Sequence, residues 1–287
     1  MDNLTHDLQQ LCRRNRDGSH ATQDDRKHSL TLAAQQLREA GFRQMRATSL
    51  KGKHVAALLA RWQREGLAVG TIKNRLAHLR WWAEKIDKAG LLPKDNTQLG
   101  IADRRYVTNI SKAVELGPEL GRITDPHVRM SLQLQAAFGL RREETIKFRP
   151  SYADRGDHLV LKGSWTKGGR ERSIPITTPE QHRVLQAAHQ LAGAGSLIPA
   201  HKSYVQQRNV YDGQCKSAGI SHMHGLRHQY AQSRYRTLTG WNAPAAGGPS
   251  GNALTPAERV QDTEARQVIS RELGHERTQV TAVYLGR

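Results

Sequence analysis

Six side chains of this sequence have the types and the order needed to attack a phosphodiester. The candidate nucleophile is Tyr284, whose phenolic hydroxyl reacts poorly until it is placed against an electrophile beside cations. Guanidinium groups pair with two phosphate oxygens at once, and imidazole or ammonium groups can donate or move a proton. The five upstream candidates are Arg141, Lys167, His224, Arg227 and His275.

The first two cations stand in recognisable local frames. Arg141 lies in a Gly-Leu-Arg-Arg-Glu-Glu run at residues 139–144, where the glycine lets the backbone turn into a charged helix start. We expect Glu144 to brace this helix, and Arg–Glu pairing on a surface helix is the alternative. Lys167 precedes two glycines at the tip of a predicted hairpin, where it could reach a phosphate or simply be solvated.

The histidines have competing interpretations. In the His-Gly-Leu-Arg-His run at residues 224–228, His224 and Arg227 share one helix face and can point at one target. A buried structural histidine is the alternative. A metal site made of His222, His224 and His228 lacks a carboxylate or cysteine to complete it, so we predict no metal. His275 precedes Tyr284 by nine residues, and a lone tyrosine near a helix end is usually ordinary packing.

Composition points to a polyanionic partner. The formal charge is +18, and the basic residues are spread over many segments rather than one amphipathic helix. No apolar run is long enough to span a membrane, and no signal peptide is visible. Aromatic residues make up only 5%, which favours duplex DNA over a single strand held by stacking. The two cysteines lack metal spacing, so we expect a reduced cytoplasmic protein with no membrane contact.

The hydrophobic pattern predicts a mainly α-helical chain with one small antiparallel β-hairpin. Residues 1–25 read as a polar arm or a short helix. A helical domain is predicted over 26–105, ending in a linker at 91–105, and a second domain over 120–287. Helices are predicted at 26–40, 51–65, 69–89, near 107–117, and at 125–138, 178–191, 203–217, 224–238, 255–273 and 276–284. Strands are predicted at 158–162 and 172–176.

Several basic residues outside the six candidates are tentative contacts to DNA phosphates. Four of them line one face of the predicted helix 69–89, and two lie in the hairpin. They are Lys73, Arg75, Arg80, Lys85, Arg170 and Arg172. A solvated basic face is the alternative interpretation, because long cationic side chains commonly project into water.

These motifs together resemble the tyrosine recombinase (phage integrase-like) family. The matching positions are the Gly-Leu-Arg-x-x-Glu frame, the Lys-Gly-x-x-x-Arg hairpin, the His-x-Leu-Arg-His frame, and the Leu-Gly-His element with its tyrosine nine residues on. The likeness is strong over about 120–287 and rests only on pattern over 25–90. It implies a two-domain DNA clamp, made of a helical core-binding (SAM-like) domain and a catalytic domain.

The resemblance also implies a mechanism. Tyr284 would form a 3′-phosphotyrosyl link while Arg141 and Arg227 hold the two non-bridging oxygens. His224 would assist proton transfer or bind one oxygen, His275 would bind a phosphate oxygen, and Lys167 would protonate the leaving 5′-oxygen. No cofactor is implied. The expected partners are duplex attachment sites, other protomers in a tetramer, and accessory DNA-bending or directionality factors. The expected role is integration of a phage or mobile element, at the nucleoid.

Two departures from the family pattern carry expectations of their own. A Gly/Pro-rich stretch at 241–252 lengthens the interval between Arg227 and His275, and we expect a neutral surface insertion, with a DNA or protomer contact as the alternative. Three residues follow Tyr284, so we expect placement of its helix to depend on DNA or on a neighbouring protomer.

Two rival functions remain. A type IB topoisomerase would use similar chemistry on a single duplex. A catalytically silent DNA-binding regulator would keep the fold without the reaction.

Overall fold

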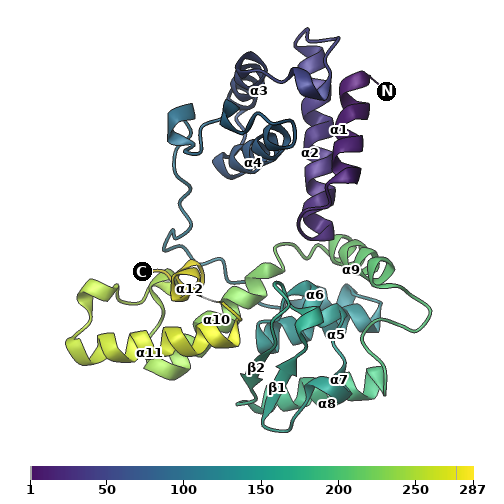
Figure 1. Cartoon of the computed structure of the whole chain (residues 1–287). Coiled ribbons are helices and arrows are strands. Elements are labelled where there is room, and N and C mark those ends of the chain that lie inside the picture. The colour runs from purple at the N-terminus through teal and green to yellow at the C-terminus, as the bar shows by residue number, and fades with distance from the viewer. Residues whose placement is uncertain (1, 276) are drawn as a thin grey trace. The chain divides into compact units, whose positions relative to one another are not determined.

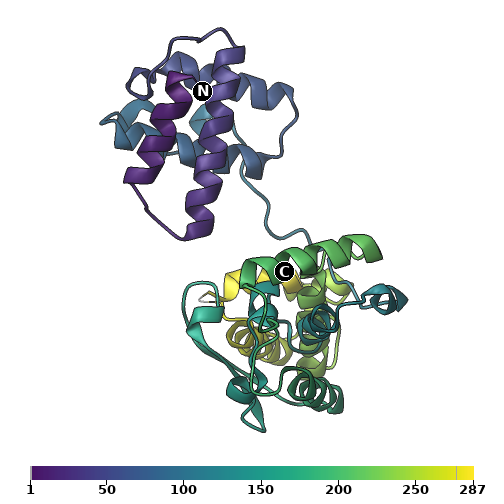
Figure 2. The same cartoon turned by 90° about the vertical axis from the view of Figure 1, so that its right-hand side faces the viewer.

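The computed structural model describes residues 2–275 and 277–287, and the chain divides into two compact units, one ending at Arg105 and the other beginning at Tyr106 (Figures 1 and 2). The first unit is helical, with α1 (Asn3–Arg14), α2 (His20–Glu39), α3 (Gly52–Arg64) and α4 (Val69–Lys85). Short 3₁₀ turns occupy Ala47–Ser49, Ala89–Leu91 and Thr97–Leu99. This arrangement gives one helical bundle with its own core.

Two tryptophans organise the core of the first unit. Trp62 and Trp82 are almost completely buried, and the indole nitrogen of each finds an acceptor. Trp62 Nε1 donates to Gln36 Oε1 at 2.8 Å, and Trp82 Nε1 donates to the Ala47 carbonyl at 3.0 Å. Because a buried N–H without a partner is costly, these bonds tie α3 to α2 and α4 to the turn Ala47–Ser49.

Of the two alternatives for residues 1–25, the structure shows the short helix. Residues 3–14 form a helix that lies beside α2 and buries Leu4 and Leu8, and α2 already begins at His20, before the predicted start at 26 (Figure 1). Leu92 and Ile101, in the predicted linker, are buried in the same core. Isolated apolar residues between turns gave no period from which this packing could be predicted.

The second unit contains the hairpin and most of the remaining helices. Its helices are α5 (Pro126–Phe138), α6 (Arg142–Ile146), α7 (Pro150–Ala153), α8 (Pro179–Ala192), α9 (Tyr204–Ala218), α10 (His224–Thr239), α11 (Pro256–Glu272) and α12 (Thr278–Leu285). Strands β1 (His158–Leu161) and β2 (Arg172–Pro175) pair antiparallel, with Leu159 opposite Ile174. The predicted fold class, mainly α with a small antiparallel hairpin, is confirmed. The predicted start of the last helix at 276 lies outside the described residues.

The helix predicted near 107–117 is absent, and this part of the prediction was wrong. Asn109 takes a left-handed backbone with φ of 53°, and the Ser111 hydroxyl accepts from the Ala113 N–H at 3.2 Å. The Val114 N–H donates to the Gly225 carbonyl at 3.1 Å instead of to its own segment. Local side-chain bonds and the contact with α10 therefore override an apolar spacing that reads as helical.

The Gly/Pro-rich stretch at 241–252 is not a neutral insertion on the surface. Ala243 is fully buried and Ala245 is nearly so, and the 3₁₀ turn Pro244–Ala246 packs against α12. A Cβ added to Gly286 would lie 2.7 Å from the Ala245 nitrogen, so the two backbones touch closely. This stretch therefore supports the helix that carries Tyr284.

No helix among residues 2–275 and 277–287 is both long and apolar enough to span a bilayer.

We predict that Gly139→Ala destabilises the protein much more than Gly240→Ala. Both glycines end helices with left-handed φ, 60° and 87°, but a Cβ at Gly139 would lie 2.5 Å from the Tyr230 ring, whereas nothing lies within 4 Å of one at Gly240. Urea denaturation should show a loss of about 1 kcal/mol at Gly240 from backbone strain alone, and about 2–4 kcal/mol at Gly139, where overpacking adds to it. Equal losses would contradict this account.

Candidate active site

The hydroxyl of Tyr284 lies between a histidine and an arginine of α10. It is 3.1 Å from His224 Nε2 and accepts from Arg227 Nε at 3.3 Å. The tyrosine side chain is only 6% exposed. Since His224 is the first residue of α10 and Arg227 the fourth, one turn of helix presents both to the same atom.

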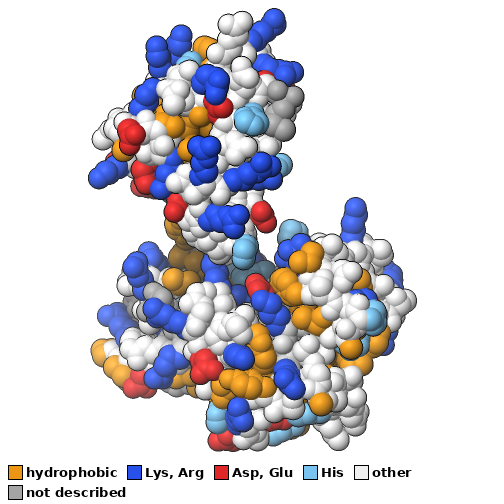
Figure 3. All heavy atoms as spheres, turned by 45° about the vertical axis from the view of Figure 1, so that its right-hand side comes forward, with side chains coloured by type: hydrophobic (Ala, Val, Ile, Leu, Met, Phe, Trp, Pro, Cys, Tyr) orange, Lys and Arg blue, Asp and Glu red, His pale blue; other side chains and the backbone are white. Residues whose placement is uncertain are grey.

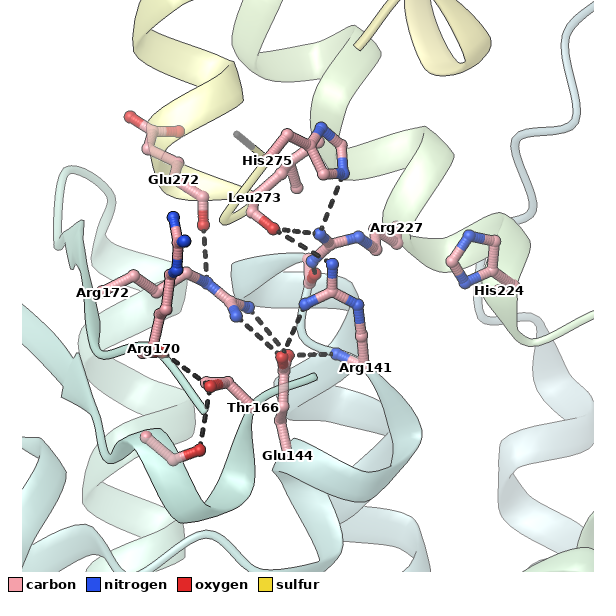
Figure 4. A network of polar contacts seen from close by, with 12 residues as sticks. Arg141, Glu144, Thr166, Arg170, Arg172, His224, Arg227, Glu272, Leu273 and His275 are labelled. Carbon is pink, nitrogen blue, oxygen red and sulfur yellow. Dashed lines mark hydrogen bonds and ion pairs between the residues drawn. The ribbon is translucent and has the colours of Figure 1, made fainter. Parts of the chain in front are cut away.

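Arg227 is held by a complete set of partners. It is fully buried, and its guanidinium donates to the backbone carbonyls of Gly139 and Leu273 and lies 3.5 Å from His275 Nε2 (Figure 4). Burial lowers the pKa of Arg227 to about 10, which leaves it cationic at neutral pH. The site therefore contains a fixed, desolvated positive charge beside the tyrosine oxygen.

Arg141 extends toward Arg227 from the start of helix α6. It precedes α6, and Glu144 accepts from its backbone N–H at 2.7 Å and from its Nη1 at 2.8 Å. Its Nη2 donates to the Leu273 carbonyl at 3.4 Å. Arg141 and Arg227 therefore share one carbonyl acceptor, which places two guanidinium groups side by side.

Glu144 is the anion of this cluster. It is fully buried and binds both Nη atoms of Arg172 at 2.7 Å, in addition to Arg141. Burial opposes its ionisation, but the hydrogen bonds and charge of Arg172, with the charges of Arg141 and Arg227, lower the pKa of Glu144 to about 2. The carboxylate thus holds the arginines in place rather than taking part in proton transfer.

Arg172, predicted as a tentative DNA contact, lies inside this network. Its side chain is 6% exposed, and its Nε donates to the Glu272 carbonyl at 2.9 Å. A Cβ on Gly274 would lie 2.8 Å from Arg172 Cδ, so the glycine of the Leu-Gly-His element leaves room for this side chain. Arg172 therefore connects β2 to α6 and α11 instead of facing solvent.

Two further imidazoles surround the Tyr284 ring. The His275 ring stacks on it at 5.2 Å between centroids, and the His228 ring lies 4.4 Å away. Thr281 Oγ1 lies 3.1 Å from His275 Nδ1. Burial and the nearby arginines lower the pKa of His275 to about 3, and burial and His224 lower that of His228 to about 4. Both rings are therefore neutral at physiological pH. In the sequence, His228 enters only the metal alternative and the His-x-Leu-Arg-His frame, and it is not among the six catalytic candidates, although it follows His224 by one helical turn.

The pKa of His224 is also lowered, by desolvation of its ring and then by the charges of Arg227 and Arg141. A neutral imidazole can accept a proton at Nε2 if its other nitrogen carries the hydrogen. The contact with the Tyr284 hydroxyl therefore suits proton acceptance as well as hydrogen bonding.

Lys167 joins the site through a cleft. The cleft has a volume of about 580 Å³, and Arg141, Lys167, Arg170 and His275 all line it. Lys167 lies in the turn after β1 and is exposed, so its flexible ammonium group can move within the cleft. The structure thus brings five predicted residues together and places the sixth, Lys167, in a cleft that two of the five, Arg141 and His275, also line.

The four basic side chains of α4 that were predicted as tentative DNA contacts have interaction partners within the first unit. Lys73 Nζ binds Asp103 at 3.0 Å, Arg80 binds Pro93 and Asn96, and Lys85 Nζ lies 3.2 Å from Asp17. Arg75 lies over the Trp62 ring at 5.3 Å. All four side chains are half-buried. Other Lys and Arg side chains are scattered over the visible face of both units in Figure 3.

Among residues 2–275 and 277–287, no group of three or more His, Cys, Asp or Glu side chains is arranged to hold a metal ion. In this part of the chain His222, His224 and His228 do not form such a group, and the rings of His224 and His228 pack against Tyr284.

Comparisons with known proteins agree with this geometry. The family model described as "Integrase" matches residues 96–233, and "Phage integrase, N-terminal" matches residues 1–89. No curated protein matches the chain. The fold is similar to a lambda integrase (75–356) dimer bound to a COC′ core site, with 14% identity, a TM-score of 0.62, and coverage of 99% of this chain and 96% of that one.

Two further structures share the fold. The Tn1549 transposon integrase in complex with circular intermediate DNA has 14% identity and a TM-score of 0.57, covering 100% of this chain and 96% of that one. XerH site-specific recombinase bound to difH has 14% identity and a TM-score of 0.57, covering 98% and 80%. The chain belongs to the tyrosine recombinase (phage integrase-like) family. This confirms the predicted class of function, a site-specific DNA recombinase.

We predict that acid weakens the fold through the buried imidazoles. The folded-state pKa of His228 is about 4 and that of His275 about 3, both below the unfolded value near 6.5. Their contribution is fully present above pH 6.5 and is lost as pH falls toward these values. Each extra proton bound by the unfolded state should lower the unfolding free energy by about 1.4 kcal/mol per pH unit.

His228→Phe tests this relation, because it keeps an aromatic ring against Tyr284 and removes one titrating group. Urea denaturation between pH 6.5 and 5 should show a slope smaller by about one proton than that of the parent protein. His182→Phe, which changes an exposed ring, is the matched control and should retain the parent slope. An unchanged slope in His228→Phe would show that this ring is not buried neutral.

Proposed function

We propose that Tyr284 is the nucleophile of DNA strand exchange. Its oxygen attacks the phosphorus of a phosphodiester, a 3′-phosphotyrosyl bond forms, and the bond to the 5′-oxygen breaks. The observation that carries this proposal is the Tyr284 hydroxyl held by both His224 Nε2 and Arg227 Nε. A proton acceptor and a cation thereby both contact the oxygen that would act as the nucleophile.

The arginines are proposed to stabilise the charge that develops on phosphorus. Arg141 and Arg227 would each donate to one non-bridging oxygen, and their shared bond to the Leu273 carbonyl holds them in place before DNA arrives. His275 would donate to a phosphate oxygen from Nε2–H, in the tautomer whose Nδ1 accepts from the Thr281 hydroxyl. Glu144 would act only through the arginines that it binds.

Protons and bonds balance without a further reactant. The proton of Tyr284 passes to His224, and Lys167 gives a proton to the leaving 5′-oxygen, because an alkoxide is a poor leaving group. The phosphotyrosyl link retains the bond energy of the phosphodiester, so the reaction as proposed uses no metal or nucleotide. Attack by a 5′-hydroxyl of a partner strand reverses these transfers and joins the new strand.

The biological setting is proposed from composition and from relatives. A charge of +18 suits duplex DNA held through its phosphates, at the nucleoid of the cytoplasm. A similar fold occurs in a lambda integrase tetramer bound to a Holliday junction, at 13% identity and a TM-score of 0.61. We propose that residues 26–105 and 120–287 form the two halves of a DNA clamp, that four protomers assemble on paired sites of a mobile element, and that accessory factors set direction.

We predict that Tyr284→Phe abolishes covalent capture of DNA and leaves affinity nearly unchanged. The phenyl ring keeps the contacts with His228 and His275 but has no attacking oxygen. Trapping on nicked suicide duplexes that carry candidate attachment sites, followed by denaturing gels, measures capture. Tyr204→Phe changes a tyrosine outside the site and should capture DNA normally. Covalent product from Tyr284→Phe would refute the assignment.

We predict that Lys167→Ala slows single-turnover cleavage by about 10²- to 10⁴-fold, as expected when a general acid is lost. A 5′-bridging phosphorothiolate substrate leaves as a thiolate, which needs no protonation, so it should restore cleavage in the variant. Lys162→Ala, in the same hairpin but not on the cleft, is the control. If sulfur substitution does not restore cleavage, Lys167 has another role.

A further inference from the structure

Residues 109–115, called the strap here, lie along α10 and reach the end of α12. The Val114 N–H donates to the Gly225 carbonyl at 3.1 Å. A Cβ on Gly225 would lie 2.5 Å from Val114 Cγ2 and 2.6 Å from the Lys112 carbonyl. The glycine between His224 and Arg227 therefore lets the strap press against the helix turn that carries both residues.

One buried glutamine links the strap to the tyrosine. Ser111 Oγ donates to Gln232 Oε1 at 2.9 Å, and Gln232 Nε2 donates to the backbone carbonyl of Tyr284 at 3.0 Å. Gln232 is 7% exposed. A carbonyl in the last turn of a helix has no partner within that helix. Gln232 supplies one, and its other end is fixed by the strap.

A second link holds the residues that follow the tyrosine. Asn109 Oδ1 accepts from the Arg287 N–H at 2.8 Å, and Asn109 Nδ2 donates to the Arg287 carbonyl at 3.2 Å. Arg266 Nη1 donates to the Gly286 carbonyl at 2.8 Å, and Leu285 is fully buried. The side-chain amide of Asn109 thus bonds both the N–H and the carbonyl of Arg287. These two bonds hold the backbone that follows Tyr284.

We propose that Asn109, Ser111 and Gln232 are positioning residues for the Tyr284 nucleophile, and this rests on the proposed function. Helix α12 has eight residues, too few to be stable alone in water. The strap and Gln232 hold it at the rotation and depth that place the hydroxyl 3.1 Å from His224 Nε2. None of the three residues touches the reacting atoms, so they act through the backbone of Tyr284.

Position of a nucleophile affects rate more than affinity, because a displacement near 1 Å can cost about 10²-fold in rate. Two variants separate position from folding. Gln232→Ala removes the bond to the Tyr284 carbonyl. Asn109→Gly removes only the exposed side chain and keeps the left-handed backbone, which glycine adopts freely. The matched control is Gln229→Ala, since Gln229 joins the same strap to the same helix through Glu115 at 2.6 Å but does not touch α12.

The experiment measures the single-turnover rate of covalent capture at saturating suicide duplex, the Kd for the same duplex, and Tm, for full-length variants. We expect a rate loss of about 10- to 100-fold for Gln232→Ala and about 5- to 10-fold for Asn109→Gly, with Kd within twofold. Gln229→Ala should retain the parent rate. The Tm of Asn109→Gly should stay well above the assay temperature, so its rate loss would not reflect unfolding.

The outcomes are separable. Rates for Gln232→Ala and Asn109→Gly equal to that of Gln229→Ala, with Tyr284→Phe inactive, would overturn the strap and leave the nucleophile assigned. A loss confined to Kd would overturn it as well. Capture by Tyr284→Phe would instead refute the proposed function on which the strap rests.

Discussion

The carboxylate of Glu144 binds the guanidinium groups of Arg141 and Arg172 where water is largely excluded, and Arg227 lies beside them with no carboxylate of its own. Three cations and one anion leave the cluster with an excess of two positive charges. Backbone carbonyls of Gly139, Leu273 and Glu272 offset part of that excess with dipoles. Carbonyl dipoles stabilise a cation without neutralising it, so the charge remains available to an incoming phosphate.

The need to hold several buried arginines explains why segments far apart in the sequence come together. The Leu273 carbonyl accepts from both Arg141 and Arg227, and His275 and Tyr284 follow Leu273 in the chain. The carboxylate of Glu272 accepts from the Tyr230 hydroxyl at 2.8 Å and from Arg234 Nε at 3.0 Å. These two bonds connect α11 to α10. Loss of the Glu144 carboxylate would leave the buried guanidinium of Arg172 without an anion, which is costly in a low-dielectric interior.

Sequence reasoning predicted much of the site because each candidate stood in a local frame whose spacing carries geometry. His224 and Arg227 are three residues apart on a helix, and Gly139 turns the chain just before Arg141. What it could not predict was pairing across long separations. Lys73, Arg80 and Arg172 look like free cations in the sequence, but they bind Asp103, Asn96 and Glu144. The short helices α6 and α7 carry too few residues to show a period.

Contacts across long sequence separations also support α12, the helix that carries Tyr284. Residues of this chain support the helix that carries Tyr284, and the expectation that its placement depends on DNA or on a neighbouring protomer stays a prediction. Asn109, Gln232 and Arg266 lie far from Tyr284 in sequence, and nothing in their local pattern marks them as its partners.

The bond between Asn109 and Arg287 spans 178 residues. Contacts that close so long a loop form late, after the intervening elements have packed. During synthesis, Asn109 leaves the ribosome long before Tyr284. The residues that form the arginine cluster lie between these two residues in the sequence. The helix that carries Tyr284 is therefore fixed late in folding, and in a partly unfolded chain the Tyr284 hydroxyl is out of place. Under the proposed function, an immature or damaged copy would still bind phosphate through the arginine cluster but would have no tyrosine oxygen in position to break the strand.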